Sequence, residues 1–165
     1  MMKSKVRLGK FSLVLFLIYG IVGFILLVAT VDNAPLFCSI LAFCILIGIV
    51  AGIFAASWLT VDERNVTIRC LLSRHRIPLS DIRETRLYKP NGQKTIFGSV
   101  GFLGYWGIFE DNFIGRYRAY YGHPDDTFLV VLNNGRQYVL GCLHPGDMIR
   151  HIDTLRKIKI EVNGR

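Results

Sequence analysis

Two apolar stretches, Phe11–Val31 and Pro35–Leu59, follow each other with only Asp32-Asn33-Ala34 between them. Asp32 is the one charged residue from Phe11 to Leu59. Each stretch reaches the roughly 20 residues that an α-helix needs to cross about 30 Å of hydrocarbon. The sequence therefore predicts a transmembrane helical hairpin over residues 11–31 and 35–59. A basic tail, residues 1–10, precedes it, and a domain of residues 60–165 follows.

The charge distribution predicts the orientation of this hairpin. The chain has 20 Lys and Arg against 12 Asp and Glu, a formal net charge of +8, and four of the cations crowd the tail: Lys3, Lys5, Arg7 and Lys10. Basic residues that flank membrane spans stay on the cytoplasmic side. Because two spans return the chain to its starting side, we expect both termini in the cytoplasm. The first apolar run is longer than the about 7–15 residues of a signal peptide, which disfavours cleavage.

Small residues recur at every fourth position of the second apolar stretch, at Gly48, Gly52 and Ala56. Such a stripe lets helices approach closely in lipid. It indicates either a homodimer contact or packing against the first stretch of the same chain, and the short loop favours the second. No Asp, Glu, Lys, Arg or His lies inside either apolar core, which argues against a proton or ion pathway.

The domain after the hairpin reads as short strands followed by one helix. Period-2 alternation and turn signals predict strands at 65–70, Ser73–Leu79, Ile82–Tyr88, Phe128–Leu132 and Arg136–Leu140. Met148, Ile152 and Leu155 then follow helical spacing after Pro145. The fold class is therefore α+β, with a small barrel or bent sandwich that the C-terminal helix closes at one end.

Two short motifs resemble bacterial pleckstrin-homology-like (PH) domains. The run Ile77-Pro78-Leu79-Ser80-Asp81-Ile82 is similar to the I-P-L-x-x-I junction of these domains, and Pro145 and Asp147 before the apolar helical positions resemble their closing helix. The resemblance covers roughly residues 60–160. It implies a seven-stranded barrel-like fold, no catalytic residues, roles in binding or assembly, and a place in the bacterial inner membrane.

The segment Phe97–Tyr121 differs from the rest of the domain. Glycine recurs at every third residue from Gly98 to Gly107, and nine of the 20 aromatic residues of the chain lie here. This spacing fits neither a strand nor an α-helix, so we expect a long irregular connection. Its aromatic residues either complete the core or form an exposed surface near the membrane for lipid or a partner. The candidate surface residues are Phe102, Tyr105, Trp106 and Phe109.

A second candidate site consists of Arg69, Arg74 and Arg76, which would lie on the first hairpin of the domain. Guanidinium groups suit phosphate geometry, so these residues could bind anionic headgroups or simply form a solvated face. Neither the four histidines nor the four cysteines show the spacing of metal ligands, and no catalytic set is recognisable, so we expect no cofactor, no metal and no enzyme activity.

Three functions stay open from the sequence. The first is a membrane-anchored interaction or scaffolding module that binds a protein partner or forms a homo-oligomer. The second is a sensor of anionic phospholipid, and the third is an accessory subunit of a larger membrane complex. Nucleic acid is not expected as a partner, because the basic residues flank membrane spans.

Overall fold

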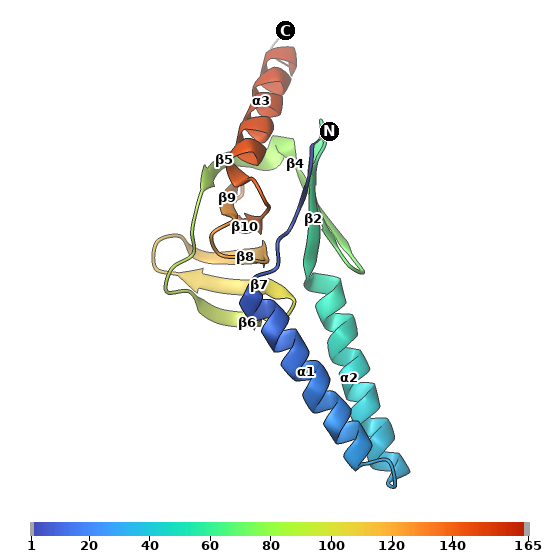
Figure 1. The fold of residues 1–165 in the computed structure, drawn as a ribbon. Helices are drawn as coiled ribbons and strands as arrows, with labels where there is room; N and C mark the ends of the chain where they lie inside the picture. The colour runs from blue at the N-terminus through green and yellow to red at the C-terminus, as the bar shows by residue number, and fades with distance from the viewer. Residues whose placement is uncertain (1, 164–165) are drawn as a thin grey trace.

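The computed structural model describes residues 2–163, with side chains through Ile158. Strand β1 (Met2–Lys5) precedes two long helices, α1 (Lys10–Ala29) and α2 (Ala34–Phe54), and the chain then enters β2 (Ala56–Val61). β1 pairs antiparallel with β2. The helical hairpin is therefore inserted between two neighbouring strands of one sheet and projects away from the β-structure (Figure 1).

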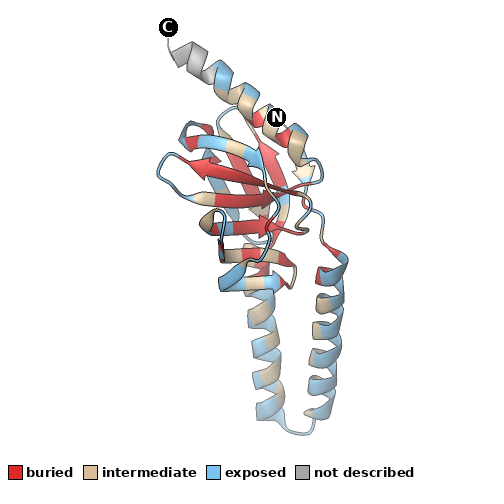
Figure 2. Cartoon of the chain, turned by 90° about the vertical axis from the view of Figure 1, so that its left-hand side faces the viewer, coloured by how far each residue is buried: buried red, intermediate tan, exposed pale blue. Residues whose placement is uncertain are grey.

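Both helices are long and apolar enough to cross a membrane by length and composition, each with a mean hydropathy of 2.8. Most of their residues are exposed, as Figure 2 shows. The second helix ends at Phe54, so residues 56–59 of the expected second span belong to β2 instead. A helix and a buried strand that follow each other directly form one apolar run, and hydropathy alone does not separate them.

The strands form two sheets. The four-stranded sheet has the order β1-β2-β3-β4, with β3 (Asn65–Cys70) and β4 (Arg74–Pro78). A 3₁₀ turn, η1 (Leu79–Asp81), leads into the six-stranded sheet, which has the order β5-β9-β10-β8-β7-β6. Its strands are β5 (Ile82–Leu87), β6 (Lys94–Gly101), β7 (Gly104–Asp111), β8 (Gly115–Tyr121), β9 (Thr127–Leu132) and β10 (Gln137–Gly141).

The two sheets form an open, sandwich-like α+β fold, which confirms the predicted fold class. Residues 2–163 contain ten strands rather than the seven that the family resemblance implies. Of these strands, β1 precedes the helical hairpin, and β6, β7 and β8 lie mostly in the segment for which the sequence pattern predicts an irregular connection. All pairs are antiparallel except β8 and β10, which run parallel.

The main core lies between the sheets and the C-terminal helix α3 (Pro145–Asn163). Val66 and Ile68 of β3 meet Phe128 of β9, and Met148 and Ile152 of α3 are fully buried against them. These two helix residues are four apart, which places them on one face, as the sequence pattern predicts. The predicted C-terminal helix is confirmed, and it covers one end of the sandwich (Figure 1).

The expectation of an irregular connection over Phe97–Tyr121 is wrong, because the segment lies mostly in the antiparallel strands β6, β7 and β8. Gly98 and Gly107 are directly opposite each other in the β6–β7 ladder, with φ of +127° and +121°. L-residues rarely adopt such angles, so glycine is required at this pair for backbone reasons. The three-residue spacing of glycine therefore reflects local backbone geometry and hides the two-residue period of the strands.

Candidate interaction surface

The turn between β6 and β7 lies against both helices. The ring of Phe102 in this turn is 5.1 Å from the Tyr19 ring and 6.2 Å from the Phe16 ring, both on α1. Trp106 on β7 stacks on Phe54 of α2, and its Nε1 donates a 3.1 Å hydrogen bond to the Phe102 carbonyl. The turn therefore connects the six-stranded sheet to the ends of the helices that adjoin the sheets (Figure 1).

Burial corrects the prediction that four aromatic residues form one exposed surface. Trp106 is only 7% exposed and Phe109 is 0% exposed, so neither ring is available to a partner. Tyr105 is half-buried and stacks on Tyr121, with 4.8 Å between ring centroids. Phe102 is half-buried between the helices and the turn. The aromatic residues instead complete the core and the junction with the helices.

The predicted small-residue stripe is also corrected. Ala56 lies in β2, and the position of a Cβ on Gly52 is 3.0 Å from Leu72 in the β3–β4 turn rather than near α1. Around Gly48, the described part of the chain leaves the Cβ position free of neighbours within 4 Å. The contact between α1 and α2 uses Tyr19 instead, whose hydroxyl donates to the Cys44 carbonyl at 3.3 Å.

The three predicted arginines come together on the outward side of the four-stranded sheet. Strand pairing aligns one row across all four strands: Lys5, Trp58, Arg69 and Arg74. A second row, two residues further along each strand, contains Lys3, Thr60, Thr67 and Arg76. The alternate residues, such as Val66, Ile68 and Ile77, are buried in the core, so these rows lie on the opposite side. We call Lys3, Lys5, Trp58, Arg69, Arg74 and Arg76 the basic face.

Trp58 is the central aromatic residue of the basic face. Lys3 Nζ lies 4.3 Å from the centroid of the Trp58 ring and Lys5 Nζ lies 5.8 Å from it, within the range of cation–π attraction. The ion pairs among the described residues include none of the five cations of this face. The face therefore presents uncompensated positive charge around an exposed indole, which suits a carboxylate or phosphate partner.

The basic face borders an apolar turn beside α2. Leu71 and Leu72, between β3 and β4, are exposed, and the Leu72 amide donates a 2.8 Å hydrogen bond to the Gly52 carbonyl. The Ser73 hydroxyl donates to the Ile53 carbonyl. A cavity of about 480 Å³ lies between this turn and the first row, with Trp58, Arg69 and Arg74 in its lining. Cationic and apolar groups therefore meet at the end of α2.

Sequence reasoning found the three arginines and missed Lys3, Lys5 and Trp58 as their neighbours. It treated the first ten residues as a tail, although Lys3 and Lys5 alternate at the two-residue spacing of a strand. It also placed Trp58 at the end of a membrane helix. Only pairing between segments that are more than 50 residues apart brings the tail to β2.

Two cysteines, Cys70 and Cys142, are buried. Burial raises the pKa of the Cys142 thiol to about 11 and also raises the pKa of Cys70, so both thiols stay protonated near neutral pH. Among the residues that the structure describes, no group of three or more His, Cys, Asp or Glu side chains could hold a metal ion. Cys70 and Cys142 are both free thiols.

Comparison with known proteins identifies a family for this chain. A family model described as the bacterial PH domain matches residues 58–157, from β2 to the third helix. The matched region includes the three arginines and Trp58 but not the two lysines of β1. Neither a curated protein nor a solved structure matches the chain.

Proposed function

The chain belongs to the bacterial PH domain family, and on that basis we propose that it is a non-catalytic interaction module anchored at the cytoplasmic face of the bacterial inner membrane. PH domains act as modules that bind lipids or proteins. The two apolar helices support the anchoring, since they are long enough to span a bilayer. The cations of the first ten residues support a cytoplasmic position for the domain.

The basic face carries this proposal, because it combines five cations and an exposed indole, and no described side chain forms an ion pair with these cations. β2 continues from α2 with only Ala55 between them, and its strand direction follows that of the helix (Figure 1). If α2 crosses a bilayer, its axis and that of β2 run across the membrane. The side of the sheet that carries the basic face is then directed parallel to the membrane surface, rather than toward the lipid. A protein with an acidic surface beside this chain is therefore the partner that the geometry favours.

The decisive experiment reverses the charge on the basic face. We expect Arg74→Glu with Arg76→Glu to reduce partner recovery at least about fivefold in mild detergent extracts, since rim charges of this kind steer association. Arg116→Glu with Arg136→Glu is the matched control, because it changes the same charge at two exposed positions, one in β8 and one in the β9–β10 turn. Quantitative mass spectrometry compares the two variants. Equal recovery with both variants would refute the assignment of this face.

Anionic phospholipid is the second candidate partner, and the exposed pair Leu71 and Leu72 beside the first cation row favours it. An apolar turn with adjacent arginines can enter the headgroup region. Hydrogen exchange of the full chain in nanodiscs tests this, with phosphatidylcholine alone or mixed with phosphatidylglycerol. Protection of the β3–β4 turn that requires phosphatidylglycerol would support lipid as the partner. Equal protection in both lipids would exclude recognition of headgroup charge.

A further inference from the structure

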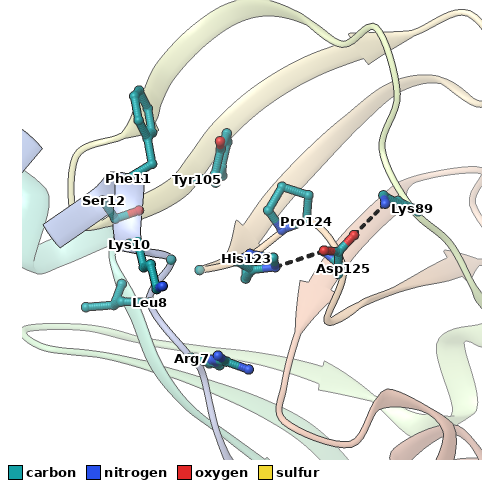
Figure 3. A pocket seen from close by; sticks show the side chains of 12 residues that line it. Arg7, Leu8, Lys10, Phe11, Ser12, Lys89, Tyr105, His123, Pro124 and Asp125 are labelled. Atoms are coloured by element: carbon teal, nitrogen blue, oxygen red, sulfur yellow. Dashed lines mark hydrogen bonds and ion pairs between the residues drawn. The ribbon is translucent and has the colours of Figure 1, made fainter. Parts of the chain in front are cut away.

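A second cationic site lies on a different part of the molecule, where the chain enters α1. A cavity of about 490 Å³ is lined by residues 7–12 and by the loop between β8 and β9, and Gly9 at its edge donates a 3.1 Å hydrogen bond to the Gly122 carbonyl. Figure 3 shows the side chains that line it, among them Arg7, Lys10, Ser12 and His123. None of the residues of the basic face lines this cavity.

The first turn of α1 opens onto this cavity without a cap. Gly9 is the N-cap residue, so no side chain can accept a hydrogen bond from the first amides, and the first turn contains no acidic residue. The first N–H groups of a helix have no partner within the helix, and the helix dipole places partial positive charge at this end. This end of α1 is therefore suited to an anion.

Ser12 gives independent evidence for a ligand at this point. Its side chain lines the cavity, is only 2% exposed, and its Oγ has no hydrogen-bond partner among the described residues. Figure 3 shows the hydroxyl oxygen on the side of α1 where Tyr105 and His123 lie. A buried hydroxyl without a partner is unusual in a folded protein, and a bound acceptor would satisfy it.

The charges around the cavity favour an anion as this acceptor. Lys89 Nζ lies 2.5 Å from Asp125 Oδ1, and His123 Nδ1 lies 3.6 Å from Asp125 Oδ2. Asp125 thus offsets Lys89, whereas Arg7 and Lys10 take part in no ion pair of the described residues. Three lining cations face one carboxylate, so the cavity retains positive charge when His123 is neutral.

From these observations we propose that the cavity binds an anionic phosphate group. The Ser12 hydroxyl, the first amides of α1, Arg7 and Lys10 would contact its oxygens. An anionic phospholipid headgroup can supply this group, because Lys10 is the first residue of α1, a helix long and apolar enough to span a bilayer, and so would lie at headgroup depth. The volume is within the range of small-molecule sites and exceeds what a lone phosphate needs. The inference rests on the proposed membrane anchoring but not on the basic face.

Native mass spectrometry of the full chain, extracted from nanodiscs of phosphatidylcholine mixed with phosphatidylglycerol, tests the proposal. We expect phosphatidylglycerol to be retained in preference to phosphatidylcholine, and Arg7→Gln with Lys10→Gln to weaken this retention about tenfold. Arg116→Gln with Arg136→Gln removes equal charge at exposed positions that do not line this cavity, and serves as the control. A second arm adds inorganic phosphate to lipid-free protein in detergent. If phosphate raises the melting temperature of the lipid-free protein, and this effect is lost in Arg7→Gln with Lys10→Gln, the site binds phosphate from solution.

Ser12→Ala separates a ligand role from a structural one. Without lipid, this variant keeps or raises the melting temperature, because it removes a buried hydroxyl that has no partner. With lipid, it lowers the retention of phosphatidylglycerol. The proposal is overturned if the control variant loses as much retention as Arg7→Gln with Lys10→Gln, or if neither lipid nor phosphate binds. Carbonate extraction of membranes measures anchoring separately, so a failure of this site leaves the proposed function standing.

Discussion

Trp106 of β7 stacks on Phe54 at the end of α2, with 5.3 Å between the ring centroids and 12° between the ring planes. One residue later, α2 gives way to the chain that enters β2. The end of α2 therefore packs against β7 of the six-stranded sheet and is also directly followed by β2 of the four-stranded sheet. Since Phe102 in the adjoining turn also contacts α1, the domain is joined to both helices by side-chain contacts as well as by the chain.

Trp106→Ala should lower the free energy of unfolding by about 3–5 kcal/mol, because it removes a buried ring at this junction. Phe102→Ala should cost less, since this residue is half-buried, and should instead speed hydrogen exchange in the part of α1 around Phe16 and Tyr19, whose rings it contacts. Denaturant unfolding and hydrogen exchange of the full chain measure both effects. Phe113→Ala, at a 79% exposed position of the β7–β8 turn, is the control. Equal stability of all three variants would show that Trp106 and Phe102 do not stabilise the contact between the sheet and the helices.

Gly98→Ala and Gly107→Ala should each destabilise the protein by at least about 2 kcal/mol, because an L-residue is strained at these φ angles. The added Cβ would also meet the Trp106 carbonyl oxygen in the first case and the Phe97 carbonyl oxygen in the second. Gly146→Ala is the control, since its Cβ position is open and the residue lies in the first turn of α3. Thermal unfolding compares the three. If either variant melts at the same temperature as Gly146→Ala, the backbones of β6 and β7 do not approach each other closely at this glycine pair.

Stability should fall as the pH falls below the ordinary pKa of histidine, in part because of His75. Burial, and secondarily the charge of Arg118, lowers the His75 pKa from its ordinary value of 6.5. The unfolded chain therefore binds this proton at a higher pH than the folded chain. The contribution of neutral His75 is complete above that ordinary pKa and is lost as the pH falls toward the lowered folded value.

Melting temperatures measured between about pH 7.5 and 5.5 test this linkage. We expect the melting temperature of His75→Gln to fall less with decreasing pH than that of the unmodified chain. His151→Gln is the matched comparison, because His151 is also half-buried, on α3. If His75→Gln leaves the slope unchanged, the buried imidazole makes no contribution to the pH dependence.

Asp153→Ala should cost about 1–2 kcal/mol, because Asp153 links α3 to β5. Its Oδ1 accepts a 2.8 Å hydrogen bond from the Thr85 hydroxyl and lies 3.4 Å from Arg156 Nη1. Arg156 Nη2 in turn donates a 2.7 Å hydrogen bond to the Arg83 carbonyl. Arg150→Ala, at an exposed position of the same helix, should cost less than about 0.5 kcal/mol. Urea unfolding separates the two, and equal losses would contradict this role of Asp153.

Local sequence patterns were sufficient to predict several elements of the fold. Composition alone marks the two apolar helices, because few charged residues interrupt them and their length matches a bilayer. Helical spacing of Met148 and Ile152 predicts the face that α3 buries, and alternation before and after Asn133-Asn134-Gly135 predicts the hairpin of β9 and β10. The family resemblance came from the same local signals.

The contacts between segments that are far apart in the chain could not be predicted from local patterns. A continuous apolar run contains both the end of α2 and the start of β2, and the tail before the helices is a strand only because β2 lies beside it. Register across four strands aligns Lys5 and Trp58 with Arg69 and Arg74, a relation that no local spacing encodes. Cross-strand neighbours are set by long-range hydrogen bonding and burial, which act between residues far apart in the chain. The candidate surface therefore follows from the fold rather than from any one segment.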